Sequence, residues 1–195
     1  MLRKNIIIFV TVFVLAMTAY YFLMRKTPET VTIPSYLEQT TEEMWKPYKD
    51  PSGHFQVLFP VDPDHASSTQ PFTSPTEQVV YHIYSAEGFD KTKYMLSLAT
   101  YPDSADMSNS SLLLQTLLEQ MANGSRHNDI IGREFVTFQN YPAMDFDLQN
   151  LEFATLGRAI IVNKTLYVLL VMNQDRDFLE KHFHTFADSL TIVKK

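Results

Sequence analysis

Two aspartates are the first residues in this sequence whose type and spacing could do chemistry. Asp145 and Asp147 stand two apart in a stretch that alternates polar and apolar residues. Residues two apart in a β-strand point to the same face, so the two carboxylates could share a cation or act as an acid and a base. The sequence supplies no third ligand at a matching spacing, so we interpret the pair as part of an exposed polar face.

Two further groups contain residue types that bind metals. Asp62, Asp64 and His65 lie in a Pro-rich segment, which lacks the Gly and the closing Glu of a calcium loop. His182 and His184 are two apart in a predicted helix, and therefore lie on different faces of it. We expect neither group to bind a metal, and we interpret His182 as a histidine at the edge of the core.

The motifs that are missing exclude several enzyme classes. The sequence contains no Cys, which removes disulfides, thiolate nucleophiles and Cys-based metal sites. It contains no Gly-x-Ser-x-Gly, Ser-x-x-Lys or His-Glu-x-x-His, and its five Gly form no phosphate-binding loop. We therefore expect a non-catalytic protein with no cofactor. An enzyme built on scattered Asp, His and Ser stays open as an alternative.

The elements that must position these residues are mostly strands. Phe55, Val57 and Phe59 alternate, which predicts a half-buried strand that ends at Pro60. A strand end over residues 45–48 precedes it, and residues 61–75, rich in Pro, Ser and Thr, are predicted to be a loop. Similar alternation predicts strands over residues 77–85, 93–101, 130–139, 141–150, 152–162 and 165–173.

Two helices complete the predicted domain. A Leu-rich helix over residues 112–122 has capping residues on both sides, and a second helix begins at the N-cap Asp175 and carries an apolar stripe to Leu190. Trp45, Tyr48, Phe55 and Phe59 could line an aromatic groove, but aromatic residues at strand spacing are typical of a core. The order predicts an α+β domain over residues 45–195, an antiparallel sheet packed by two helices.

The N-terminus predicts a membrane anchor. Residues 1–5 are short and basic, and residues 6–24 contain no charge. As a helix, residues 6–24 would span roughly 28 Å, which matches the hydrocarbon core of a bilayer. A cleaved signal peptide is the alternative, but the apolar run continues without a polar segment before it ends. A helix buried in the domain is disfavoured because the run has no polar face.

Charge indicates how the rest of the chain is placed. Arg3, Lys4 and the amino terminus give a small excess of positive charge before the predicted anchor, so we expect a cytoplasmic N-terminus and a single-pass protein whose domain is exported to the periplasm or cell surface. Residues 25–44 read as a tether. All 22 Asp and Glu follow Lys26, and so acidic a domain makes nucleic acid a poor partner.

Five segments of the predicted domain show a recurring pattern of apolar strand and helix positions: Phe55-Gln-Val-Leu-Phe-Pro60, Tyr141-Pro-Ala-Met-Asp-Phe-Asp147, Arg158-Ala-Ile-Ile-Val162, Thr165-Leu-Tyr-Val-Leu-Leu170 and Phe183-His-Thr-Phe-Ala-Asp-Ser-Leu190. In this pattern residues 45–195 resemble the PsbP-like superfamily of small α+β domains. The resemblance implies the scaffold and a mostly non-catalytic role, with no site residue that can be carried over. The plant proteins that name the family stabilise a membrane photosystem, and many bacterial relatives are exported, tethered modules.

These observations favour an accessory module that is held at a membrane and binds an envelope protein. A carrier that encloses a small molecule or lipid in an apolar pocket is the alternative, which the aromatic residues permit without indicating it.

Overall fold

The computed structural model of the chain describes residues 45–124, 128–177 and 179–193. In it, the alternating residues that follow Trp45 form a small sheet. Its central strand β2 (Phe55–Phe59) pairs antiparallel with β1 (Lys46–Lys49) on one edge and with β10 (Thr191–Ile192) on the other. The predicted anchor and tether lie outside the described residues. Within those ranges, no helix is long and apolar enough to cross a membrane.

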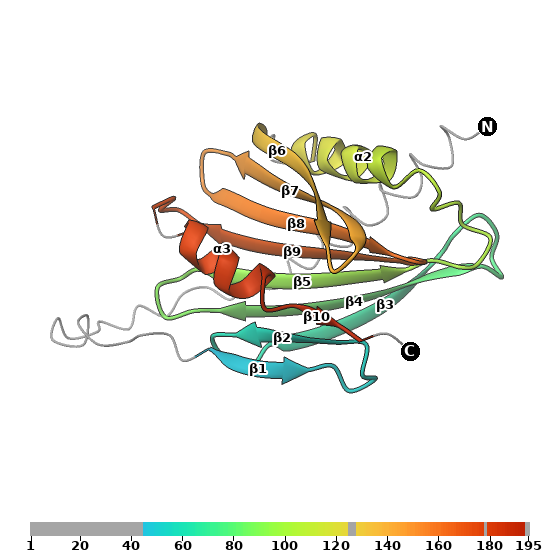
Figure 1. Cartoon of the computed structure of the whole chain (residues 1–195), viewed down its shortest axis with the longest axis horizontal. Coiled ribbons are helices and arrows are strands. Elements are labelled where there is room, and N and C mark those ends of the chain that lie inside the picture. The colour runs from blue at the N-terminus through green and yellow to red at the C-terminus, as the bar shows by residue number, and fades with distance from the viewer. Residues whose placement is uncertain (1–44, 125–127, 178, 194–195) are drawn as a thin grey trace, which may run out of the picture.

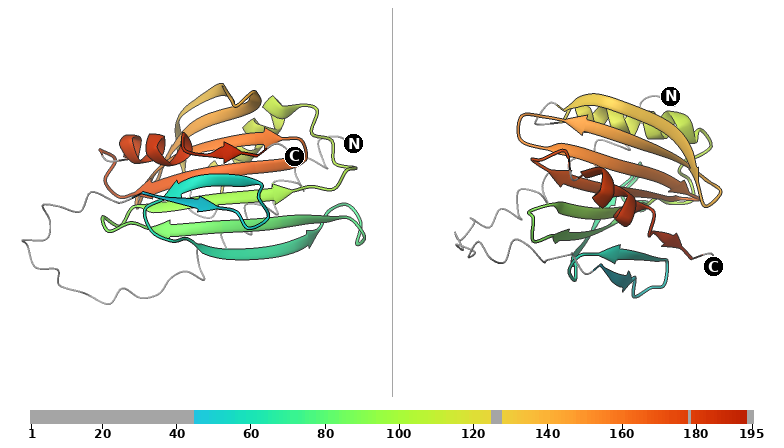
Figure 2. Two further views of the ribbon diagram at one scale, coloured as in Figure 1. Left: turned by 60° about the horizontal axis from the view of Figure 1, so that its bottom comes forward. Right: turned by 60° about the vertical axis from the view of Figure 1, so that its left-hand side comes forward.

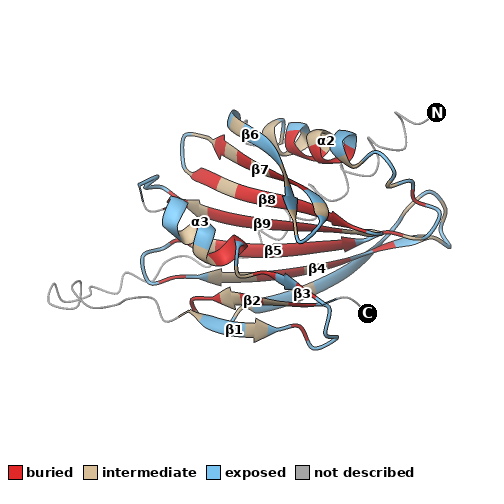
Figure 3. Cartoon of the chain, viewed as in Figure 1, coloured by how far each residue is buried: buried red, intermediate tan, exposed pale blue. Residues whose placement is uncertain are grey.

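A second, seven-stranded antiparallel sheet forms the body of the domain, with the order β3-β4-β5-β9-β8-β7-β6 (Figure 1). The central strands β5, β9 and β8 are almost wholly buried, whereas the edge strands β3 and β6 are largely exposed (Figure 3). Its strands are β3 (Asp64–Pro71), β4 (Gln78–Glu87), β5 (Lys93–Thr100), β6 (Asp129–Phe138), β7 (Tyr141–Gln149), β8 (Ala154–Val162) and β9 (Thr165–Asn173).

Alternation along the strands divides the apolar residues between two cores, one on each face of this sheet. Helix α2 (Ser110–Ala122) buries its leucines against one face, over β6, β7 and β8. Helix α3 (Leu179–Ala187) covers the other face over β8 and β9, and the small sheet packs on the same face, where Tyr48 and Phe55 contact Tyr84 of β4. The two helices thus lie on opposite sides of the sheet (Figure 2). On the α3 face of β6, Glu134 is exposed, whereas Val136 and Phe138 pack against this core.

The registers place one row of side chains across all seven strands on the α3 face. The directly paired residues along this row are His65, Tyr84, Leu96, Leu169, Arg158, Asp145 and Glu134. Its middle is apolar and buried, whereas its β7–β6 end is charged. The charges of the row begin at Arg158, beside α3, and continue to Asp145 and the exposed Glu134, so the uncovered corner of the sheet is polar.

Most predicted elements are confirmed, with three corrections. The last helix begins at Leu179, so Asp175, whose carboxylate accepts a hydrogen bond from the Asp177 amide at 3.0 Å, is not its N-cap. The prediction of a loop over residues 61–75 is wrong, because residues 64–71 form the edge strand β3. Its side chains are nearly all exposed, so no apolar alternation marks it in the sequence. The single predicted sheet is two sheets, since β10 joins β2 outside the main one. Asn109 caps α2 as predicted, its side chain accepting a hydrogen bond from the Leu112 amide at 3.1 Å.

Gly157 offers a test of how the sheet packs under α2. A Cβ there would overlap the Phe146 ring and stand 2.8 Å from Leu170 Cδ2, so we expect Gly157→Ala to lower the free energy of unfolding by about 1–3 kcal/mol. Gly132→Ala is the matched control, because its Cβ would meet nothing nearer than Asp147 Cβ at 3.9 Å. Urea unfolding of the purified full chain measures both, and equal stability of the two variants would contradict this packing.

Candidate functional site

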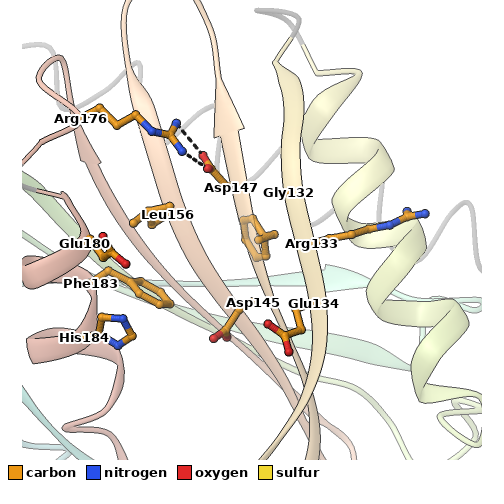
Figure 4. A pocket seen from close by; sticks show the side chains of 11 residues that line it. Gly132, Arg133, Glu134, Asp145, Asp147, Leu156, Arg176, Glu180, Phe183 and His184 are labelled. Carbon is orange, nitrogen blue, oxygen red and sulfur yellow. Dashed lines mark hydrogen bonds and ion pairs between the residues drawn. The ribbon is translucent and has the colours of Figure 1, made fainter.

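A groove of about 450 Å³ opens on the uncovered corner of the large sheet, between β6, β7 and α3 (Figure 4). We call it the α3 groove. Its floor is the end of the charged row described above, and its wall is the first turns of α3. The lining residues are Gly132, Arg133, Glu134, Asp145, Phe146, Asp147, Leu156, Arg176, Glu180, Phe183 and His184.

The structure brings the two predicted aspartates to this groove, on one face of β7 as the spacing required. Asp145 accepts two hydrogen bonds from Arg158, from Nε at 2.7 Å and from Nη2 at 2.8 Å. Asp147 likewise accepts two hydrogen bonds from Arg176, the one from Nη1 at 3.2 Å. Both pairs are bidentate, the geometry in which a guanidinium binds a carboxylate most strongly.

Arg158 is the buried member of this group. Its guanidinium also donates to Asp188 Oδ1 at 2.7 Å and lies over the rings of Phe138 and Phe183, 5.0 and 5.5 Å from their centroids. Burial alone would lower the pKa of Arg158, but the hydrogen bonds that it donates to Asp145 and Asp188 outweigh burial and raise the pKa. The arginine therefore stays charged and holds β7 and the end of α3 together.

Arg176 and His184 complete the polar wall. The hydrogen bonds with Asp147 raise the pKa of Arg176, which lies just before α3 and stays half-exposed. His184 Nδ1 lies 3.1 Å from Asp188 Oδ2, one turn further along the helix. His182 faces elsewhere, as predicted from its spacing. The two aspartates of the groove thus each have a guanidinium partner that is part of the packing, whereas Glu134 and Glu180 are exposed.

A second polar cluster lies under the small sheet, around the buried Asp50. Ser52 and His54 belong to the same turn, and the hydroxyl of Tyr84 donates to Asp50 Oδ1 at 3.0 Å. These are the residue types of a nucleophilic triad, but Ser52 Oγ and Asp50 Oδ2 both face the same ring nitrogen, Nδ1 of His54, at 2.5 and 3.4 Å. A triad needs the serine and the acid on opposite nitrogens, so the cluster is a turn lock.

His65 joins this cluster from β3. Its ring stacks on Tyr84, with centroids 4.4 Å apart, and its Nε2 lies 3.2 Å from Nδ1 of His82. Burial, and then the neighbouring His65, lower the pKa of His82. Asp62 and Asp64 add no ligand to the pair, and among the described residues no three His, Asp or Glu side chains are placed to hold a metal.

The third cluster involves the predicted core histidine. His182 Nδ1 contacts the hydroxyl of the buried Tyr94, and its Nε2 lies 3.8 Å from Asp90 Oδ2. The rings of Trp45 and Tyr94 meet edge to face at 5.2 Å. Phe55 and Phe59 are fully buried, and Tyr48 packs between them, so the four predicted aromatic residues belong to the core rather than to a groove.

Sequence reasoning missed both arginines that define the α3 groove. Arg158 and Arg176 lie 13 and 29 residues from the aspartates that they bind, so no local spacing connects them. One signal was present: Arg158 is the only charge in an otherwise apolar strand, and a cation in such a place requires a carboxylate partner.

Comparison with known proteins gives matches of structure alone. No protein-family profile matches the sequence, and no curated protein matches it. The chain is similar to the solution structure of cyanobacterial PsbP from Synechocystis sp. PCC 6803, with 14% identity and a TM-score of 0.49, covering 76% of this chain and 92% of that one.

A second similar structure is that of PA94, a Pseudomonas aeruginosa protein of unknown function. The identity is 12% and the TM-score 0.40, and the alignment covers 77% of this chain and 97% of that chain. Both likenesses concern the scaffold.

The two arginine–aspartate pairs should differ in what they contribute to stability. We expect Asp145→Asn to lower the free energy of unfolding by about 1–3 kcal/mol, because it leaves the buried Arg158 only Asp188 as a carboxylate partner. Asp147→Asn should cost less than about 1 kcal/mol, since Arg176 can turn to solvent. Denaturant unfolding of both variants measures the difference, and an equal cost would show that Arg158 does not depend on Asp145.

The Asp50 lock should make stability depend on pH in acid. Burial raises the pKa of Asp50, but hydrogen bonds from Ser52, His54 and Tyr84 outweigh it and hold the pKa below the ordinary 3.8. A carboxyl whose folded pKa is depressed stabilises the fold above its unfolded pKa and loses that contribution as pH falls through the folded value. The contribution should therefore be complete at pH 7 and decline below about pH 4.

Unfolding of Asp50→Asn between pH 7 and pH 2 tests this expectation. The variant should be less stable by about 1–2 kcal/mol at pH 7, and the gap should close in acid. The exposed Asp62→Asn is the control and should change stability by less than about 0.5 kcal/mol. A gap that is constant with pH would contradict the lock.

Proposed function

We propose that this chain is a non-catalytic module, tethered to a membrane by residues 6–24 and exported, which binds an envelope protein at the α3 groove. The observation that carries the proposal is that Asp145 and Asp147 are each held by both nitrogens of an arginine. A general base must be able to accept a proton from a substrate, and these carboxylates have their oxygens committed to guanidinium groups. The chemistry that they offer is therefore recognition.

The surface around the groove supports a protein as the partner. Charges of both signs line it, because Glu134 and Glu180 are exposed acids and Arg176 is an exposed cation, whereas the Arg133 side chain points away from the groove (Figure 4). Mixed charges at the rim of an interface fix register and suppress wrong partners, and they need no deep cavity. Beside the groove, β6 pairs only with β7 in the described sheet and leaves its other edge accessible.

Features of β6 also explain why this edge does not invite indiscriminate pairing. A register shift interrupts its pairing between Ile130 and Gly132, and Arg133 and Glu134 follow directly. Bulges and charges are the means by which natural edge strands resist aggregation. A partner must therefore match the charges of the α3 groove, which makes recognition depend on side chains.

The alternative of a carrier with an apolar pocket has no specific observation in its favour. The α3 groove is lined mostly by charged side chains, and the two apolar cores are filled by the side chains of the sheet and helices. That alternative stays a prediction, as do the export of the domain and the anchor itself.

Site-specific photo-cross-linking in intact cells tests the proposed function. A photo-reactive residue in place of Glu134, in the full-length chain, should cross-link one reproducible envelope protein, and Glu180→Lys should weaken that cross-link at least tenfold because it reverses a charge of the groove wall. The matched control is a photo-reactive residue in place of Gln70, which is exposed on the opposite edge strand β3. Equal capture at Gln70, or capture that Glu180→Lys leaves unchanged, would overturn the groove as the binding surface.

A further inference from the structure

One end of the large sheet gathers exposed apolar side chains at the tips of its loops. Leu151 is fully exposed (106%) in the β7–β8 loop, and Phe89 is 67% exposed in the β4–β5 loop. Ile130 and Ile131, at the start of β6, are exposed at 39% and 55%. Half of the exposed large apolar residues in the described ranges therefore lie at this end, Phe89 and Leu151 on separate loops and the two isoleucines side by side in β6.

The registers show that these loops belong to the same end. Glu87 pairs with Lys93, Lys93 with Met172, and the pairing continues through Asn173 with Ala154 to Gln149 with Asp129. One end of each of these six strands, β4 to β9, therefore lies at the same end of the sheet, on the left in Figure 1. We call this the entry end, defined by the loops 88–92 and 150–153 and by Trp45.

The chain enters the domain at this same end. Trp45, the first described residue, packs against Tyr94, and its ring lies 6.3 Å from that of His182. Tyr94 is the second residue of β5, next to the loop that carries Phe89. The segment that precedes Trp45 contains the predicted anchor, so the domain presents its apolar loop tips on the side from which the anchor departs.

We propose that the entry end seats on the surface of the bilayer, with Phe89 and Leu151 inserted at the lipid interface. This rests on the tether of the proposed function, because the tether keeps the entry end near the membrane. A flexible stretch of 18 residues, the length of segment 27–44, would have an end-to-end reach of roughly 20–25 Å, which would let the domain rest on the bilayer. Once it is tethered, the membrane is always within reach of the loop tips, so even a weak contact is occupied.

The spacing of the tips favours a bilayer over a protein as the occupant. Three strand spacings separate the two loops, about 14 Å, with β5, β9 and β8 between them. Charged residues stand beside both tips, among them Asp90 and Lys91 next to Phe89 and Glu152 next to Leu151. A protein interface needs one contiguous packed patch, whereas a fluid bilayer accepts separate apolar tips and solvates the charges between them with its head groups.

The excess of acidic over basic residues at the entry end also indicates which class of lipid it contacts. In the loops 88–92 and 150–153 and the neighbouring β9–α3 connection, four acids (Asp90, Glu152, Asp175 and Asp177) outnumber two cations (Lys91 and Arg176), so anionic lipids give no net attraction. Binding of the entry end to the bilayer therefore depends on the insertion of Phe89 and Leu151 between lipids whose head groups carry no net charge. It leaves β6 and the α3 groove at the side of the domain, accessible to a partner in the same membrane.

Because the chain has no Cys, single-cysteine probes can test this directly. We would label Phe89→Cys and Leu151→Cys with an environment-sensitive fluorophore in the full-length chain, reconstituted in phosphatidylcholine vesicles. The control is Thr76→Cys, exposed at the opposite end in the β3–β4 connection, and Leu15→Cys reports on the anchor. Quenching by nitroxide carried on the lipid chains shows which probes reach the bilayer.

The expected result is a blue shift and lipid-dependent quenching at positions 15, 89 and 151, with neither at position 76. A lipid signal at position 15 with none at 89 and 151 would overturn the seating and leave the tether standing. A probe at position 15 that stays in water would overturn the tether and the proposed function with it. Equal quenching at 76 and 151 would overturn the seating as well, since it would show contact without orientation.

Discussion

One buried guanidinium sets the arrangement on which the rest of the α3 side depends. Arg158 lies in the middle of an apolar strand, and a charge there would be costly unless it were neutralised by close partners. The chain meets this requirement from three directions, with Asp145 from β7, Asp188 from the end of α3, and aromatic rings above and below. Because Asp188 directly follows the last residue of α3, the position of the helix over the sheet is tied to this one side chain.

The groove follows from the same constraint. A helix held at β8 and β9 cannot also cover β6, so the outer strands keep a polar face and the carboxylates remain at its edge. The charges therefore organise the fold first and present a recognition surface second. The other face needs no such device, because α2 lies over β6, β7 and β8 and its leucines fill a purely apolar core.

Residue patterns were sufficient for most of the scaffold and for little of the site. Strands with one buried face were predictable, since Phe55, Val57 and Phe59 show their orientation in the sequence. Strand β3 was not, because an edge strand exposed on both faces has the composition of a loop. The spacing of Asp145 and Asp147 correctly gave their common face, but their partners are distant in the chain and depend on tertiary packing. The predicted anchor falls outside the described residues and stays a prediction.

The pairing of β10 with β2 carries a consequence for how the domain is made. Thr191 and Ile192 pair with Gln56 and Phe55. The Gln139 side chain also holds this C-terminal segment, since it donates a hydrogen bond to the Leu190 carbonyl and accepts one from the Ile192 amide. Contacts between segments so far apart in the chain form late in folding. During synthesis, the aromatic core beneath β2 stays incomplete until residues 191–192 have emerged. The core under α2 uses no buried residue beyond Leu170, so it can close before this last segment is made.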